Sequence, residues 1–367
     1  MIAVLIFNHF TLSYLCRTIK VKRSQQQSEE QARGEDGGVD RNKVIIGSAL
    51  CLIASMAWGA MFPVAGSALK HVDAFYFTLI RYVSVSVLLV LLLLFKEGRK
   101  AFRFEGKGKL LLFYGTMAFA VYNIFIFWGQ ELMGEPGIIV ASLMEAMMPM
   151  ISIGLVWAMK RKAPPRYAIL SMIVAFIGAI FVITKGNWAF FLSLQGAFLP
   201  LLFLFIAVVG WVVYTMGGSQ FGDWSILRYS TLTCVLGTFV SFIIVGIGSM
   251  LGLLDVPTLH TVWTIKYEMG YMILIAGLAA LLSWNAGIKR LGAVNGILFI
   301  NFVPITTLVI MAIQGYTISL FEYYGTFLVI LALIYNNVYQ RKSTVRIQAA
   351  QSSRHPITAL DQPKVRA

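Results

Sequence analysis

The stretch GNWAFFLSLQGAFLPLLFLFIAVVGWVVYTMGGSQFG, residues 186–222, contains no charged side chain over 37 consecutive positions. A helix needs about 20 apolar residues to cross a hydrocarbon core about 30 Å thick. Other uncharged stretches of 26, 21, 26 and 31 residues lie on both sides of it, at 44–69, 110–130, 229–254 and 291–321. These runs are continuously apolar and lack the in/out alternation of barrel strands. The sequence therefore predicts an all-α polytopic membrane protein.

The composition excludes several classes of protein. Of the 367 residues, 58% are apolar and 13% are charged, whereas a soluble domain carries about 25% charged residues. This low charge content excludes soluble enzymes, nucleic-acid-binding proteins and disordered chains. Three cysteines and four scattered histidines form no ligand cluster, and no nucleophile, zinc-protease or phosphate-loop motif is present. We therefore expect no metal, no cofactor, no catalytic residue and no enzymatic activity.

Splitting the hydropathy at polar loops predicts ten transmembrane helices. They lie near 44–66, 74–95, 109–130, 136–159, 166–184, 196–217, 225–247, 270–288, 293–314 and 321–339. With the segment before the first helix inside, 25 of the 30 lysines and arginines fall on the inner side and only Lys70, Lys185 and Lys266 on the outer side. Positive charge is retained on the cytoplasmic side of membranes. The sequence thus predicts a multi-pass plasma-membrane protein with both termini cytoplasmic.

Both ends of the chain differ from the membrane region. Residues 1–43 combine a short apolar segment with a polar run and are interpreted as a partly disordered extension, interfacial or dispensable. An additional helix within residues 1–15 is the alternative, as is a misassigned start. Residues 341–367 are interpreted as a disordered cytoplasmic tail.

The two halves of the membrane region, 44–186 and 187–340, resemble each other. Matched features occur in the same order, among them Trp58 and Trp211, Arg81 and Arg228, and the Trp–Pro pairs 128/149 and 284/304. Five helices per half is an odd number, so the second half would enter the membrane from the opposite side. Inverted repeats of this kind are typical of secondary transporters, which bind substrate between the halves near the bilayer midplane.

These features resemble the EamA-type transporters of the drug/metabolite transporter superfamily, over about residues 44–340. The resemblance rests on the following residues: Trp58-Gly59, Phe62-Pro63, Arg81, Pro149, Gly186, Trp284-Asn285, Gly292 to Gly296, and Pro304. It implies ten helices in two inverted five-helix units that move a small metabolite by alternating access. The N-terminal extension and Glu145 are not part of the family pattern.

We therefore predict a secondary active transporter for an amino acid or a related amphipathic compound, acting as an exporter. Its partners would be the small-molecule substrate and the lipid bilayer, without nucleic acid, and the sequence leaves the oligomeric state open. Facilitated uptake of a small solute, a membrane-embedded lipid-modifying enzyme and a sensory or scaffold protein are the alternatives.

Glu145 is the most informative candidate residue, because it lies near the middle of the predicted helix at 136–159. A charged group at that depth costs about 2.5–3.5 kcal/mol, so it should face a cavity or a partner. Pro149 lacks the amide that would bond the carbonyl of Glu145. Glu145 is interpreted as a proton acceptor, which would give proton coupling, or as a substrate-amine ligand. A structural pair with an arginine, or a protonated packed side chain, is the alternative.

Arg81 could bind a substrate carboxylate, or pair with Asp73 or Glu145, or extend to the outer interface. Aromatic and amide side chains inside the predicted helices are candidate cavity walls, with ordinary packing as the alternative: Trp58, Trp211, Tyr214, Trp284, Asn285 and Asn301. Three helix-interior prolines are candidate gating bends or static kinks: Pro63, Pro149 and Pro304.

Overall fold

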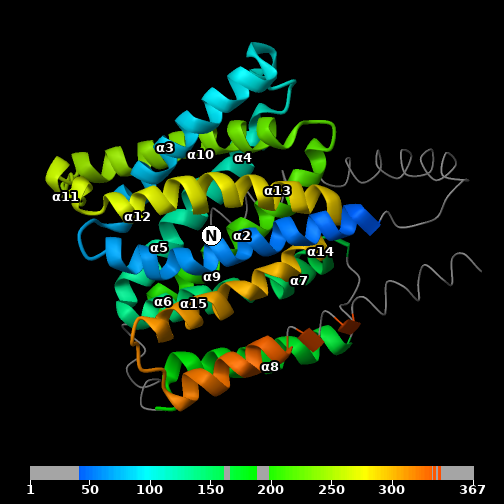
Figure 1. Cartoon of the computed structure of the whole chain (residues 1–367), viewed down its shortest axis with the longest axis vertical. Coiled ribbons are helices and arrows are strands. Elements are labelled where there is room, and N and C mark those ends of the chain that lie inside the picture. The colour runs from blue at the N-terminus through cyan, green and yellow to red at the C-terminus, as the bar shows by residue number, and fades with distance from the viewer. Residues whose placement is uncertain (1–40, 161–165, 188–197, 333, 336–337, 340–367) are drawn as a thin grey trace, which may run out of the picture.

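The computed structural model describes residues 41–160, 166–187, 198–332, 334–335 and 338–339. Within these ranges every regular element is a helix, and the helices share one general direction (Figure 1). The predicted N-terminal extension, up to residue 40, and the predicted C-terminal tail lie outside the described residues.

Six helical spans of the described chain are long and apolar enough to cross a membrane, judged by length and composition. They are α2 (Arg41–Ala68), α3 (Ala74–Glu97), the run α4 (Gly108–Gly115), η2 (Thr116–Tyr122) and α5 (Asn123–Met133), α9 (Phe198–Gly217) with η4 (Gly218–Phe221), α10 (Ile226–Met250), and the run α12 (Lys266–Gly270), η5 (Tyr271–Ala279) and α13 (Ala280–Leu291).

The remaining apolar segments are bent or short. The predicted helix at 136–159 is divided into α6 (Glu135–Glu145) and α7 (Met148–Lys160), which are bent by 44° and could form a seventh span. Three shorter helices follow: α8 (Arg166–Thr184), the segment Ile297–Ile313 with η6 (Ile297–Asn301) and α15 (Phe302–Ile313), and Leu320–Ala332. The structure thus establishes six or seven long spans in the described chain, and the predicted number of ten is not confirmed.

Local sequence signals explain several helix ends. The Asp73 carboxylate accepts hydrogen bonds from the backbone amides of Phe75 and Tyr76 at 2.9 and 3.0 Å, which caps the first turn of α3. Ser225 caps α10 in the same way by accepting from the amide of Arg228 at 2.9 Å. α3 ends at Gly98, whose φ of 73° is readily adopted only by glycine.

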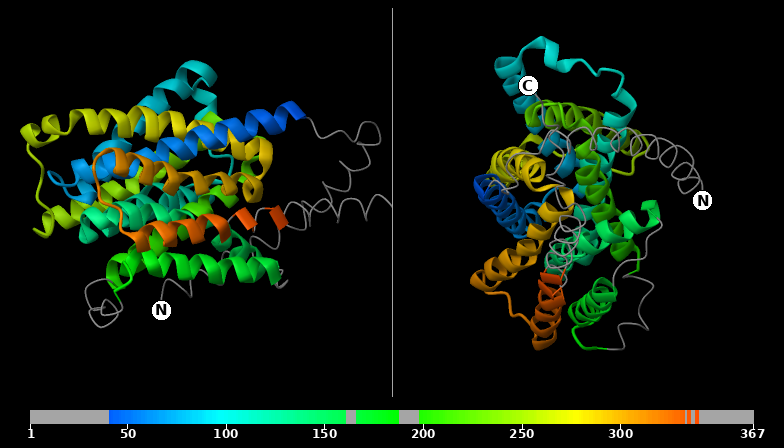
Figure 2. Two further views of the ribbon diagram at one scale, coloured as in Figure 1. Left: turned by 60° about the horizontal axis from the view of Figure 1, so that its bottom comes forward. Right: turned by 90° about the vertical axis from the view of Figure 1, so that its right-hand side faces the viewer.

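The helices form a central bundle and a separate peripheral pair. In the bundle, α2 packs against α13 and α15, α3 packs against α10, and α5 packs against α9. The peripheral pair consists of α8 and the helix Leu320–Ala332, which lie side by side at one edge in all three views (Figures 1 and 2). Gly178 and Gly325 bring these two backbones close together, because a Cβ atom on either would overlap the other's carbonyl oxygen.

The two halves carry the same irregularities at corresponding places. The third span contains the π-helical segment η2, and its counterpart in the second half contains the π-helical segment η5. The next helix along the chain is interrupted in both halves, between α6 and α7 and by the 3₁₀ segment η6. π-Helical turns are rare and concentrate at functional sites. Their shared position supports an internal repeat and directs attention to the middle of the bundle.

A close helix crossing in the described bundle joins α4 to α10 at Gly115 and Gly237. A Cβ atom on Gly237 would overlap the carbonyl oxygen of Gly115, so no larger residue fits there without moving a helix. Gly246, nine residues further along α10, has open space where its Cβ atom would be. The same helix therefore provides a test position and a matched control.

We expect Gly237→Ala to lower the unfolding temperature of the purified protein by about 3–6 °C, because overpacking costs about 1–3 kcal/mol. Gly246→Ala should leave it unchanged or raise it slightly, since alanine favours helices over glycine. Thermal unfolding followed by tryptophan fluorescence in one detergent measures both. Equal unfolding temperatures for the two variants would contradict the close crossing.

Candidate functional site

Glu145 lies at the break between α6 and α7. The amides of Ala146 and Met147 bond back to the carbonyls of Leu143 and Met144 at 3.0 and 3.1 Å, in the tight pattern that ends a helix. Pro149 then offers no amide to the carbonyl of Glu145. The side chain of Glu145 is buried, with 1% of its surface exposed. The break therefore holds a carboxyl group inside the bundle, about 15 Å from the start of α6.

The two carboxyl oxygens of Glu145 have different surroundings. Oε1 accepts a hydrogen bond from the hydroxyl of Tyr122, the last residue of the π-helical segment η2. Oε2 is buried and has no hydrogen-bond partner among the described residues. A buried polar atom without a partner costs about 1–3 kcal/mol, so such atoms are rare and call for an explanation.

A cluster of aromatic rings adjoins this carboxyl group through Tyr122 and draws on both halves of the chain. The ring centroids of Tyr122 and Trp211 lie 5.0 Å apart. The ring centroid of Trp58 lies 5.1 Å from that of Trp211 and 5.1 Å from that of Trp284. Tyr214 lies 5.2 Å from Trp211. Four of the candidate wall residues from the sequence are therefore in one place, between the halves.

Two of the three indole nitrogens in this cluster have a hydrogen-bond acceptor. Trp58 donates to the carbonyl of Ala276 at 3.0 Å, and Trp284 donates to the hydroxyl of Thr215 at 3.3 Å. The Nε1 atom of Trp211 is buried and has no partner in the described part of the chain. One acceptor, Glu145 Oε2, and one donor, Trp211 Nε1, thus remain open in the same cluster.

Arg81 is buried, with 1% of its surface exposed, and forms no ion pair within the described residues. Its Nε donates to the carbonyl of Met272 at 3.0 Å and its Nη1 to Oδ1 of Asn123 at 3.2 Å. Nη2 faces only the sulfur of Met61, at 3.9 Å, which is a weak acceptor. Arg81 therefore links η5 to the residue that follows η2, and it keeps donor capacity on Nη2.

The two candidate asparagines differ in their contacts. Asn285 is a helix tie, because its Nδ2 donates to the hydroxyls of Tyr214 and Ser230, both at 2.8 Å. Asn301 lies in η6, and its buried Oδ1 has no partner among the residues that the structure describes.

Each candidate proline lies either where a side chain from another helix bonds the freed carbonyl or where the helix is interrupted. Pro63 removes the amide that would bond the carbonyl of Gly59, and the hydroxyl of Thr307 in α15 donates to that carbonyl at 2.8 Å. Pro149 lies just beyond the break that ends α6, and Pro304 lies just beyond η6. Each of the three prolines is thus near a contact or a discontinuity of the central bundle.

Comparison with known proteins agrees with this architecture. Residues 45–184 and 198–338 both match the EamA-like transporter family. The chain belongs to the EamA-like transporter family. Two successive segments of the chain match the family, in agreement with the helix irregularities that recur in both halves. The match confirms the family resemblance found in the sequence.

Two relatives and one solved structure extend the comparison. The chain is 52% identical over 318 residues to the Uncharacterized transporter YrdR of Bacillus subtilis (strain 168), covering 87% of this chain and 99% of the relative. It is 27% identical over 259 residues to the Uncharacterized transporter YyaM of the same organism, covering 69% and 81%. A crystal structure of a protein at 14% identity superposes with a TM-score of 0.60, over 81% of this chain and 98% of that one, and supports the fold alone.

The structure adds residues to this candidate site that the sequence did not single out. Tyr122 is the partner of Glu145, and Thr307 is the partner of the carbonyl freed by Pro63. Tyrosine and threonine are ordinary residues in apolar helices, so neither has a distinctive sequence signal. The position of Tyr122 directly before the mid-helix Asn123 is the one feature that could have drawn attention to it.

Arg228 belongs to a second cluster, at the end of the bundle that the cation distribution predicts to be cytoplasmic. Its Nη2 lies 2.8 Å from Oε1 of Glu105, and its guanidinium lies 3.8 Å from the ring centroid of Trp224. The indole of Trp224 donates to Oε2 of Glu105 at 3.0 Å. The cluster fastens the loop before α4 to the start of α10.

The Glu105 contact has a defined pH dependence. The hydrogen bond from Arg228 holds the pKa of the Glu105 carboxyl below its ordinary value of 4.5. A lowered pKa in the folded state adds stability above the unfolded-state pKa, and this stability is lost as pH falls through the folded-state pKa.

We expect Glu105→Gln to lower the unfolding temperature by at most a few degrees at pH 6–8, because exposed ion pairs contribute little. The difference from wild type should shrink as pH falls below 4.5 and through the lowered folded-state pKa, because the wild-type carboxylate then also becomes neutral. Thermal unfolding across this pH range measures the difference, with Glu135→Gln as the control for general acid effects. A difference that stays the same as pH falls from 7 into the acid range would contradict an electrostatic role for Glu105.

Proposed function

We propose that this chain is a secondary active transporter that exports a small amphipathic metabolite, an amino acid or related compound, across the plasma membrane by alternating access. The observation that carries the proposal is the pair of open polar atoms, Glu145 Oε2 and Trp211 Nε1, buried in an aromatic cluster between the two halves. Buried groups without partners are expected where a ligand or a proton completes the site.

The proposal includes an arrangement of the whole chain. The six long spans, the bent pair α6–α7 and the three short apolar helices would together form ten membrane helices in two inverted five-helix repeats, 44–186 and 187–340. The distribution of positive charge supports cytoplasmic termini. Residues 1–43 would be an extension and residues 341–367 a tail that take no part in transport.

In this proposal Glu145 binds the substrate amine through Oε2 or exchanges it for a proton. The Nη2 side of Arg81, which faces only a sulfur atom, binds the substrate carboxylate. The walls of the site come from the aromatic cluster and the two amides: Trp58, Trp211, Tyr214, Trp284, Asn285 and Asn301. The bends at Pro63, Pro149 and Pro304 allow the helices to move between inward-open and outward-open states. Transport needs no chemical step, so we propose that the protein is not an enzyme.

Proton coupling through Glu145 is testable in liposomes that contain a pH-sensitive dye. Adding amino acids outside should move protons with wild-type protein, and Glu145→Gln should slow this movement by about tenfold or more, because loss of a charged hydrogen bond costs about 1.5–3 kcal/mol. Glu135→Gln, at the exposed start of the same helix, is the matched control. Wild-type proton movement in Glu145→Gln would rule out coupling through this residue.

The direction of transport can be tested in growing bacteria. Overproduction of the wild-type protein should raise the highest tolerated concentration of at least one amino acid or toxic analogue, because an exporter lowers its internal concentration. Glu145→Gln at the same protein level should not raise it. A lowered tolerance with wild type would point to uptake, the alternative that the sequence leaves open.

A further inference from the structure

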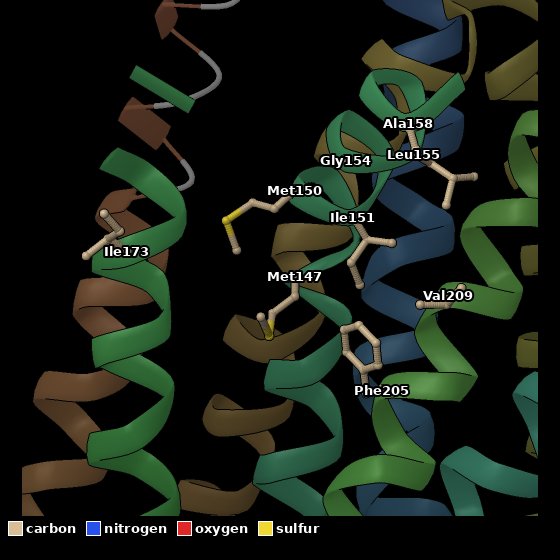
Figure 3. Close-up of a pocket in the computed structure, with 9 residues that line it drawn as sticks. All are labelled: Met147, Met150, Ile151, Gly154, Leu155, Ala158, Ile173, Phe205 and Val209. Atoms are coloured by element: carbon tan, nitrogen blue, oxygen red, sulfur yellow. The ribbon is translucent and has the colours of Figure 1, made fainter. Parts of the chain in front are cut away.

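An apolar pocket of about 550 Å³ lies between the central bundle and the peripheral pair (Figure 3). Met147, at the break between α6 and α7, and Ile151 of α7 line one side, Phe205 of α9 lines another, and Ile173 of α8 lies across from them. Every side chain that lines the pocket ends in carbon or sulfur, and none carries a hydrogen-bonding group of ordinary strength. The lining therefore suits a hydrocarbon ligand and offers nothing to a polar one.

The pocket opens sideways, toward the medium that surrounds the helices. Ile173 and Phe205 keep 53% and 44% of their surface exposed, and each lies seven residues from the start of its helix. A cavity with an apolar lining does not hold ordered water, and an empty one forfeits the van der Waals contacts of its walls. In a bilayer, the apolar material that can enter from the side is the acyl chain of a lipid.

The length of the pocket matches one leaflet of a bilayer. Along the chain its lining runs from Met147 to Ala158, a helical rise of about 16 Å. Half of a hydrocarbon core about 30 Å thick is about 15 Å. Met147 lies at the middle of the apolar segment 136–159 and Ala158 near the end that the cation distribution predicts to be cytoplasmic. The pocket thus extends from the middle of the membrane to its cytoplasmic surface.

A cation lies at the cytoplasmic end of the helix that closes the pocket. Arg166 is the first residue of α8 and is exposed. It precedes Ile173 by seven residues, which is two helical turns, so both side chains lie on the same face of α8. A lysine or arginine at the membrane surface attracts anionic lipid by about 1 kcal/mol. The face of α8 that borders the pocket therefore combines a hydrocarbon contact with a charge that complements an anionic headgroup.

We propose that the pocket binds one acyl chain of an anionic phospholipid of the cytoplasmic leaflet, and that Arg166 attracts its headgroup. The acyl chain takes the place of protein packing between α7 and α8, so lipid helps to attach the peripheral pair to the central bundle. This proposal uses the membrane orientation given under the proposed function and is independent of the transported substrate.

Gly154 provides a test of the acyl-chain contact. It lines the pocket, and a Cβ atom added to it meets nothing within 4 Å, so Gly154→Leu fills the pocket from α7. Gly246→Leu in α10 adds the same side chain into open space on a helix that does not line the pocket. It is the matched control for a larger apolar surface.

The headgroup contact is tested with Arg166→Gln. The matched control is Arg99→Gln in η1 (Arg99–Phe102), which removes another exposed cation of the predicted cytoplasmic side. η1 and α8 lie at opposite ends of the molecule in Figure 1.

The probes are dioleoyl phosphatidylglycerol, which is anionic, and dioleoyl phosphatidylcholine, which has the same chains and no net charge. Affinity for the first bound lipid is measured by native mass spectrometry of the delipidated full chain in detergent. We expect wild type to prefer phosphatidylglycerol by about fivefold and Arg166→Gln to lose this preference, whereas Arg99→Gln keeps it. Gly154→Leu should bind both lipids about tenfold more weakly, because the acyl chain loses its buried contacts, and Gly246→Leu should bind them as wild type does.

Unchanged affinity of Gly154→Leu for both lipids would overturn the proposal, as would equal affinity of wild type for the two lipids. An equal loss of preference in Arg166→Gln and Arg99→Gln would overturn the headgroup contact. If Gly154→Leu unfolds at a lower temperature than wild type without lipid, Ile173→Trp fills the same pocket from α8 and takes its place. The assay measures lipid binding without transport, so failure of amino-acid export or of proton coupling leaves its result intact.

Discussion

The structure depends on the requirement that polar groups inside a membrane protein find partners within the protein, because hydrocarbon offers none. Pro63 frees the carbonyl of Gly59, and Thr307 from a distant helix bonds it. Buried Arg81 is held by the carbonyl of Met272 and the amide oxygen of Asn123. Against this background of satisfied groups, the open oxygen of Glu145 is one of a few exceptions among the described buried side chains, with Trp211 Nε1 and Asn301 Oδ1 among the others.

The same requirement explains why the site lies where helices are irregular. A regular helix pairs its own interior backbone groups, so a side chain that bonds one of its carbonyls must share it, as Thr231 does with the carbonyl of Leu89 at 3.3 Å. The π-helical segments η2 and η5 supply Tyr122 for Glu145 and the Met272 carbonyl for Arg81, respectively. The break after Glu145 lets a carboxyl group and a helix end occupy the same depth. Irregular helix segments and buried polar contacts therefore occur together, with η2 in the first half and η5 in the second.

Hydropathy predicted the all-helical class, because long apolar runs are visible in the sequence alone, and the motif residues and the repeat supported the family resemblance. Hydropathy predicted one helix at 136–159, because a bend of 44° leaves the hydropathy profile unchanged. Pro149 already indicated a carbonyl without its helical partner in this segment. The sequence named Trp58, Trp211 and Trp284 as separate candidates and did not predict that they are in contact. Their contact depends on how each helix is rotated about its axis, and an all-apolar helix has no polar face from which that rotation could be predicted. The contact of Arg228 with Glu105 could not be predicted from the sequence, because Glu105 lies in a loop 123 residues away along the chain.

Arg81 and Glu145 differ in how much of their hydrogen-bonding capacity the protein itself uses. In the proposed site, this difference would narrow the range of substrates. Arg81 has committed Nε and Nη1 to the protein and retains Nη2 beside a sulfur atom, whereas Glu145 has committed one oxygen and retains the other. A carboxylate can therefore gain at most part of the guanidinium, but an amine can gain a whole carboxylate oxygen. Recognition would then rest mainly on the amine end of a zwitterion. The carboxylate end would then orient the substrate more than it holds it.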